Sequence, residues 1–276
     1  MNRLVYILLT ALFATACIRD VGLVNHFEER LVVDGRIEAG HNAVVMLSLN
    51  REFSEEYSEE ELRDMVVRWA KVTLCCEGEE AVLIGRSDEN FPTHYIYRST
   101  HIIGEVGKSY TLTVDYSSQR WSAQSHIPAP LQLTDIRVES VDGLHYSITA
   151  ILPPSDTPCS IDCSLDGSSY FAPRILGVYD ASAESRRITI NPPIEGFGYS
   201  TLFDGEDVVV LRLNTLTPFG YEHWSCWENN VVNTFNPVFP AHDNLPTNLT
   251  NNTFGIWSGY GSSYHFVGKL SEAVHN

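Results

Sequence analysis

The sequence predicts a mainly β protein in which two β domains follow an N-terminal export signal. Short apolar runs with strand-like alternation recur along the chain, with turn residues between them. Only segment 219–231 carries a long helical pattern. Pro128 and Pro130 interrupt the series of strands, since proline cannot continue a β-ladder. Many short strands without interleaved helices favour a β-sandwich.

Residues 1–17 have the layout of a secretory signal peptide and are expected to lie outside the fold. Arg3 supplies a positive charge, and the apolar run after it is too short to span a bilayer, which takes about 20 residues. Small residues then lead directly into Cys17, so the segment resembles a bacterial lipoprotein signal, in which this cysteine is acylated and becomes the new N-terminus. The alternative is an ordinary signal peptide with a chance cysteine.

The first β domain is expected over residues 18–130. Its predicted strands, separated by turns, are 31–37, 42–49, 69–78, 80–86, 110–116 and 121–127. Apolar and polar residues alternate most clearly from Tyr110 to Tyr116. Segment 54–65 is rich in Glu and offers Ser58 as an N-cap, which predicts a short acidic helix or a mobile loop.

The second β domain is expected over residues 131–276. Its predicted strands are 131–140, 143–152, 158–167, 186–193 and 207–216. The helix expected at 219–231 carries Tyr221, Trp224 and Trp227 on one face. Because a lone helix on a sheet must bury its apolar face, we expect this stripe to be core rather than a ligand site.

Charge and cysteine content argue against several kinds of partner and site. The chain has 18 Lys+Arg against 35 Asp+Glu, a net charge of −17, whereas nucleic acid and anionic membrane surfaces require a basic footprint. Six cysteines leave five beyond Cys17, an odd number whose spacing provides no zinc site. We expect these five to be mostly buried free thiols.

Motifs that carry chemistry are absent from the sequence. There is no zinc-protease motif, no phosphate-binding loop, no dinucleotide fingerprint and no Gly-x-Ser-x-Gly nucleophile motif. We therefore expect a protein without a cofactor, without a metal and without enzymatic activity. A hydrolase whose two carboxylates come from distant segments would escape this search and stays an alternative.

Several segments in a fixed order resemble a known family. They are Leu-Val-Val-Asp-Gly-Arg-Ile at 31–37, Val-Met-Leu-Ser within 42–49, Gly-Lys-Ser-Tyr-Thr-Leu-Thr-Val at 107–114, Ile-Pro-Ala-Pro at 127–130, and the Asn- and Gly-rich segment 244–266. Together with the lipoprotein signal, they resemble a Bacteroidetes lipoprotein family catalogued as domain of unknown function 4249. The resemblance covers nearly the whole mature chain.

The resemblance implies an immunoglobulin-like or carboxypeptidase-regulatory-like β-sandwich followed by a second β domain. Members of this family tend to be encoded beside TonB-dependent outer-membrane receptors. This context implies a lipid-anchored accessory or binding protein at the outer membrane, and the family brings no catalytic residues. The main alternative is an adhesive, fimbria-like surface module, because sandwich edges can accept donor strands.

The candidate residues for binding a ligand or partner lie in the closing segment. Trp257, Tyr260 and Tyr264 stand among Gly and Ser, where flat aromatic faces suit stacking on sugars or peptides. The other interpretation is a terminal strand that buries Trp257. We favour that interpretation for Trp257 and leave both open for the two tyrosines, while Cys17 is the predicted lipidation residue.

Overall fold

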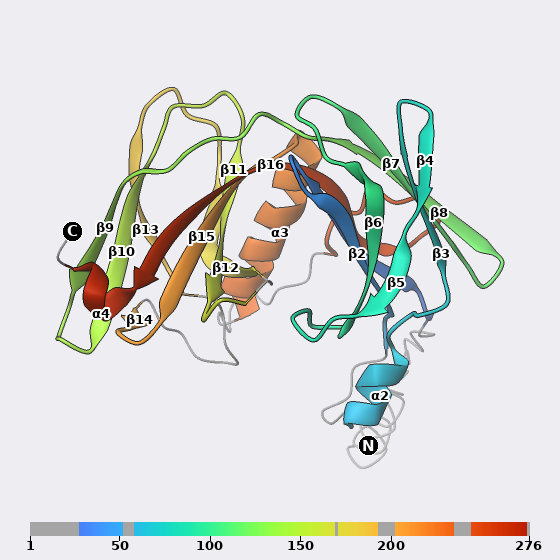
Figure 1. The fold of residues 1–276 in the computed structure, drawn as a ribbon, viewed down its shortest axis with the longest axis horizontal. Coiled ribbons are helices and arrows are strands. Elements are labelled where there is room, and N and C mark those ends of the chain that lie inside the picture. The colour runs from blue at the N-terminus through green and yellow to red at the C-terminus, as the bar shows by residue number, and fades with distance from the viewer. Residues whose placement is uncertain (1–27, 52–57, 169–170, 193–201, 235–243, 275–276) are drawn as a thin grey trace, which may run out of the picture.

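The computed structural model describes residues 28–51, 58–168, 171–192, 202–234 and 244–274 (Figure 1). The expected signal peptide and Cys17 lie outside the described residues. Within them the fold is mainly β, as the sequence predicts, and consists of two β-sandwiches that share one long sheet.

The long sheet has eight strands in the order β12-β11-β15-β16-β1-β2-β6-β5. In that order their bounds are Ala172–Tyr179, Cys159–Leu165, Val208–Thr215, Phe254–Lys269, Leu31–Glu38, Asn42–Leu49, Tyr95–Ile103 and Ile84–Ser87. Two smaller sheets of four strands each pack against its two halves.

The smaller sheets complete the two sandwiches. The first has the order β4-β3-β7-β8, with bounds Glu79–Val82, Lys71–Cys76, Ser109–Tyr116 and Gln119–His126. The second has the order β13-β10-β14, with β9 also paired to β10, and bounds Arg186–Ile190, His145–Leu152, Phe203–Asp204 and Thr134–Ser140. The described helices are α2, α3 and α4, with bounds Glu59–Asp64, Pro218–Thr234 and Leu270–Ala273.

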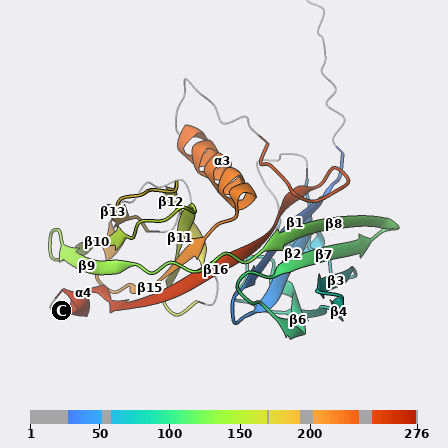
Figure 2. The ribbon, with the colours of Figure 1, turned by 90° about the horizontal axis from the view of Figure 1, so that it is seen from above.

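Strand β16 joins the two sandwiches (Figure 2). Its residues 254–260 run parallel to β1, and its residues 261–269 run antiparallel to β15. The first part therefore belongs to the N-terminal sandwich, although a boundary near Pro130 assigns it to the second domain. A single strand of 16 residues thus carries the sheet from one sandwich into the other.

Each half of the long sheet buries one face in a core. In β1, Leu31, Val33 and Ile37 lie in the N-terminal core, and in β15, Leu211 and Leu213 lie in the C-terminal core. Because side chains alternate between the faces of a strand, the residues between them lie on the opposite face of the sheet. Helix α3 packs against this sheet through β11, β12 and β16.

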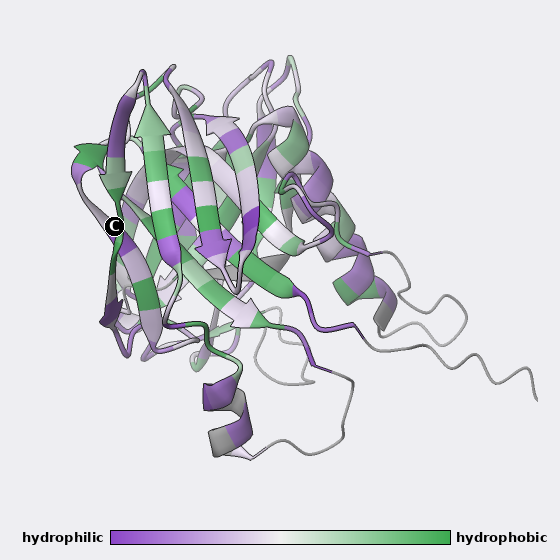
Figure 3. Ribbon diagram, turned by 90° about the vertical axis from the view of Figure 1, so that its right-hand side faces the viewer, coloured by the Kyte–Doolittle hydropathy of each residue, from purple (hydrophilic) through white to green (hydrophobic). Residues whose placement is uncertain are grey.

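Most of the predicted elements are present near their predicted positions. The helix expected at 219–231 is α3, and the acidic helix is α2, which stands off from the sheets (Figure 3). Ser58 caps α2, because its Oγ accepts a hydrogen bond from the Glu61 N–H at 3.2 Å. The strands β6, β12 and β14 were not predicted, because polar residues or glycine interrupt their apolar pattern, whereas β16 is the terminal strand that was one of the two interpretations of the closing segment.

No disulfide joins the cysteines of the described residues. Cys76, Cys159 and Cys163 are buried, whereas Cys75 and Cys226 are half-buried. The described residues contain no group of three or more His, Cys, Asp or Glu side chains arranged for a metal ion. None of the described helices has the length and apolar character that crossing a bilayer requires.

Candidate functional site

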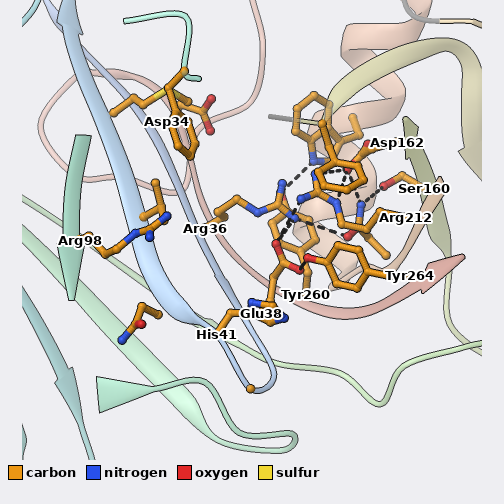
Figure 4. A pocket seen from close by; sticks show the side chains of 18 residues that line it. Asp34, Arg36, Glu38, His41, Arg98, Ser160, Asp162, Arg212, Tyr260 and Tyr264 are labelled. Atoms are coloured by element: carbon orange, nitrogen blue, oxygen red, sulfur yellow. Dashed lines mark hydrogen bonds and ion pairs between the residues drawn. The ribbon is translucent and has the colours of Figure 1, made fainter. Parts of the chain in front are cut away.

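A cavity of about 250 Å³ lies on the face of the long sheet that is turned away from the two cores (Figure 4). Strands β1, β2 and β6 line it from the N-terminal sandwich, β11 and β15 line it from the C-terminal sandwich, and the shared strand β16 lines it with residues of both of its halves. Trp224 of α3 also lines the cavity. The cavity therefore lies where the shared sheet passes from one sandwich to the other.

The register of the sheet brings the polar side chains of the cavity together. Asp34, Arg36 and Glu38 alternate along β1, so they share one face. On the other side of the cavity, Arg212 of β15 lies opposite both Asp162 of β11 and Tyr264 of β16. Directly opposite residues in neighbouring strands point to the same face, which places acids and arginines in one cluster.

Arg212 is the centre of a buried ion-pair network. Its Nη1 lies 3.2 Å from Glu38 Oε1, and its Nη2 lies 2.5 Å from Asp162 Oδ2. Arg36 Nη2 lies 2.7 Å from the same Glu38 oxygen. The side chains of Arg212 and Glu38 are only 5% and 7% exposed, so these charges interact with little screening by water.

Neutral groups add further hydrogen bonds to the network. Tyr264 Oη donates a hydrogen bond to Glu38 Oε2 at 2.5 Å. Asn214 Nδ2 donates to Asp162 Oδ2 at 2.6 Å, and Ser262 Oγ donates to Asn214 Oδ1 at 2.8 Å. A buried polar network with its bonds made is rigid, whereas one with a missing member is costly.

The electrostatics of the network keep Glu38 ionised. Burial alone raises the pKa of Glu38, but Arg36, Arg212 and the hydrogen bond from Tyr264 outweigh burial and hold the pKa at about 2. Burial opposes the charge of Arg36, and Glu38 together with other neighbouring groups raises the Arg36 pKa overall. The Glu38 carboxylate and the Arg36 guanidinium therefore remain charged at neutral pH.

The Glu38→Gln variant is expected to remove part of the acid sensitivity of the protein. The pKa of Glu38 falls from 4.5 when unfolded to about 2 when folded, so its stabilisation is present above about pH 4.5 and is lost as the pH falls toward 2. This loss is on the order of 3 kcal/mol. Urea unfolding at a series of pH values measures it, with the exposed Glu89→Gln as control. If the free energy of unfolding of wild type and of Glu38→Gln fell equally as the pH is lowered, the prediction would be contradicted.

Aromatic side chains form the wall of the cavity beside the network. The Arg36 guanidinium lies 4.7 Å from the centre of the Tyr260 ring, and the Arg212 guanidinium lies 4.3 Å from that of Phe171. Trp224 Nε1 donates a hydrogen bond to Tyr260 Oη at 3.0 Å. These contacts fix the aromatic rings against the charged cluster.

The three candidate aromatic residues of the closing segment lie in two different places. Tyr260 and Tyr264 line the cavity, from the face of β16 that also carries Ser262. Trp257 points the other way and is fully buried in the N-terminal core, where its Nε1 donates to the Tyr110 carbonyl oxygen at 3.0 Å. An odd separation along a strand places side chains on opposite faces, which accounts for the difference.

Two charged groups of the cavity stand apart from the network. Asp34 and Arg98 line the cavity, and the side chain of neither makes an ion pair or hydrogen bond with the described residues. Asp34 is open to water from the cavity but surrounded by protein, and burial raises its pKa against the opposing effects of Arg36 and His223. Burial, followed by Arg86, lowers the pKa of Arg98.

Sequence reasoning did not single out the charged residues of the cavity. The signal was present as the pattern Asp-x-Arg-x-Glu at 34–38 and Arg-x-Asn at 212–214, inside strands that were predicted. Such alternation is also typical of a strand with one face in water. Only the register across β11, β15, β16 and β1 shows that these charges meet.

Comparisons with known proteins identify the family of the chain. A search among curated proteins found no match. The family model described as "Domain of unknown function (DUF4249)" matches residues 20–263, which include most of both sandwiches and all of the cavity lining except Tyr264. The chain therefore belongs to the DUF4249 family.

Proposed function

We propose that the protein is a lipid-anchored binding protein of the bacterial cell envelope, and that it works beside a TonB-dependent transporter at the outer membrane. In this proposal the cavity between the sandwiches holds a small polar ligand. The observation that carries the proposal is the preformed cavity, with a rigid charged floor, aromatic walls and two charged groups left without partners.

The state of the carboxylates favours binding over hydrolysis. A hydrolase with two carboxylates needs one of them free to donate a proton and the other free to act as base or nucleophile. Glu38 and Asp162 are instead both bound to Arg212, and the pKa of Glu38 is held at about 2. Only Asp34 remains without an arginine partner among the described acids of the cavity.

The proposed anchor agrees with the charge of the chain. A net charge of −17 repels anionic lipid surfaces, so acyl chains on Cys17 would be the means of attachment. Acylation at this position would leave a short N-terminal segment before β1, and the folded part would stay close to the membrane. A protein held in this way can meet a transporter in the same membrane.

Affinity isolation from membrane extracts tests this function. The tagged full-length wild type is expected to fractionate with the outer membrane and to recover a TonB-dependent receptor after gentle solubilisation. Cys17→Ala is expected to leave the membrane fraction and to recover much less receptor, because the acyl attachment point is gone. Cys75→Ala, which removes a half-buried thiol of β3, serves as the matched control and should behave as wild type.

The two parts of the proposal have separate outcomes. Retention of Cys17→Ala in the membrane would contradict the lipid anchor. A correctly anchored wild type that recovers no transporter would contradict the transport role and would favour an adhesive surface module instead.

A further inference from the structure

The charges of the cavity do not all pair with one another. Three carboxylates and three guanidinium groups line it: Asp34, Glu38, Asp162, Arg36, Arg98 and Arg212. The network around Arg212 neutralises four of these groups. One acid and one base remain, Asp34 and Arg98, and Figure 4 shows both on the side of the cavity away from that network.

Arg98 and Arg36 form two sides of a space that suits an anion. Arg36, Val44 and Arg98 lie directly opposite one another across β1, β2 and β6, so the two arginines flank a small apolar side chain on one face. The Nε atom of each arginine is buried and lacks a hydrogen-bond partner. Buried donors without partners are rare in proteins, and a ligand oxygen atom would satisfy them.

Asp34, two residues before Arg36 on β1, offers the opposite charge. It lies opposite Met46, two residues along the strands from the Arg36–Val44 pair, and therefore on the same face of the sheet. The cavity lining also includes Met46 and the aromatic rings of Phe91, Trp224 and Tyr260. A carboxylate beside aromatic rings suits an ammonium group.

The spacing of the two groups sets the size of the ligand. From Asp34 to Arg98 the sheet is crossed from β1 over β2 to β6, with a displacement of two residues along the strands. This corresponds to about 12 Å between their Cα atoms. Their side chains take up part of this span. The cavity volume of about 250 Å³ is many times the space that a single water molecule needs. An amino acid or a dipeptide has this size.

We propose that the cavity binds a zwitterion, either an amino acid or a dipeptide, with its ammonium group on Asp34 and its carboxylate between Arg98 and Arg36. This inference rests on the proposed binding function and names its class of ligand. A ligand with only one charge would leave either Asp34 or Arg98 desolvated and without a partner. That penalty selects against diamines, dicarboxylates and neutral sugars.

Calorimetry and thermal shift on the purified full chain test the proposal. The probes are the twenty amino acids and the dipeptides of the Ala-x series, with putrescine, succinate and glucose as comparison ligands. At least one zwitterion is expected to bind and to raise the melting temperature. Blocking its amine by acetylation, or its carboxylate by amidation, is expected to weaken binding at least tenfold in each case.

Two variants assign the charges to their residues. In Asp34→Asn, acetylation of the peptide should cause little further loss, and in Arg98→Gln the same should hold for amidation. The matched control is the exposed ion pair on β7 and β8, where Asp115→Asn and Arg120→Gln should leave binding unchanged. The comparison of free and blocked peptides on wild type stands even if a variant is unstable.

The outcomes separate this inference from the proposed function. If succinate, putrescine or glucose bound and no zwitterion did, the inference would be overturned, whereas the proposed binding of a small polar ligand would stand. Binding of blocked and free peptides with equal affinity would also overturn it. Absence of binding by every probe, together with no recovery of a transporter from membranes, would overturn both proposals.

Discussion

Replacing Arg212 with methionine is expected to lower the free energy of unfolding by about 3–5 kcal/mol. The substitution leaves Asp162, whose side chain is only 14% exposed, without a guanidinium partner, and it leaves Glu38, whose side chain is 7% exposed, with Arg36 alone. Removal of one partner from a buried ion pair costs far more than the pair itself contributes, because the other charge stays desolvated. Urea unfolding at neutral pH measures the change.

Two comparison variants make this prediction specific. Arg120→Met removes an arginine that is 70% exposed and pairs with Asp115, and it should leave the free energy of unfolding close to that of wild type. Arg212→Lys keeps the charge but not the planar fork that reaches both acids, so an intermediate loss is expected. A loss below about 1 kcal/mol in Arg212→Met would show that the network contributes little to stability.

The network has a consequence for binding as well as for stability. Arg212, Glu38 and Asp162 come from three strands of both sandwiches, so their mutual bonds hold the two sides of the cavity floor at a fixed separation. A site that is already ordered loses less conformational entropy when a ligand binds. Arg212→Met is therefore expected to weaken zwitterion binding even though Arg212 is not assigned to the ligand.

The regular strands could be predicted because their side-chain pattern is local. In β1 and β7, apolar and polar residues alternate over a whole strand, and this period identifies both the strand and its buried face. Strand β16 lacks that signal, since its residues 254–269 are mostly Gly, Ser and aromatic residues that suit a loop as well as a strand. Its length and its two partners depend on contacts with β1 and β15, which are far away in the sequence.

The cavity could be anticipated only in part for the same reason. The aromatic residues of the closing segment drew attention by their composition, and the structure places Tyr260 and Tyr264 in the cavity and Trp257 in the core. Arg212 and Asp34 looked like ordinary surface charges of half-exposed strands. Their role depends on the register of β11, β15, β16 and β1, and no local pattern encodes that register.

Trp257→Ala is expected to destabilise the protein by about 3–5 kcal/mol, because it empties the centre of the N-terminal core. The indole is fully buried, and it packs so closely on β1 that a Cβ atom added at Gly35 would lie 2.8 Å from Trp257 Cε3. The substitution also removes the hydrogen bond to the Tyr110 carbonyl oxygen. Trp69→Ala is the matched control: this side chain is 91% exposed, and its loss should change stability by less than about 0.5 kcal/mol.

The same variant shows whether the shared strand makes the two sandwiches unfold together. Trp257 lies in the half of β16 that pairs with β1, whereas the other half of β16 pairs with β15. If the continuous strand couples the cores, Trp257→Ala should speed amide hydrogen exchange equally in β7 and in β10, which belong to different sandwiches. Faster exchange confined to β7 would mean that the N-terminal sandwich opens alone. In that case the cavity, which needs both sandwiches, would be lost before the C-terminal core unfolds.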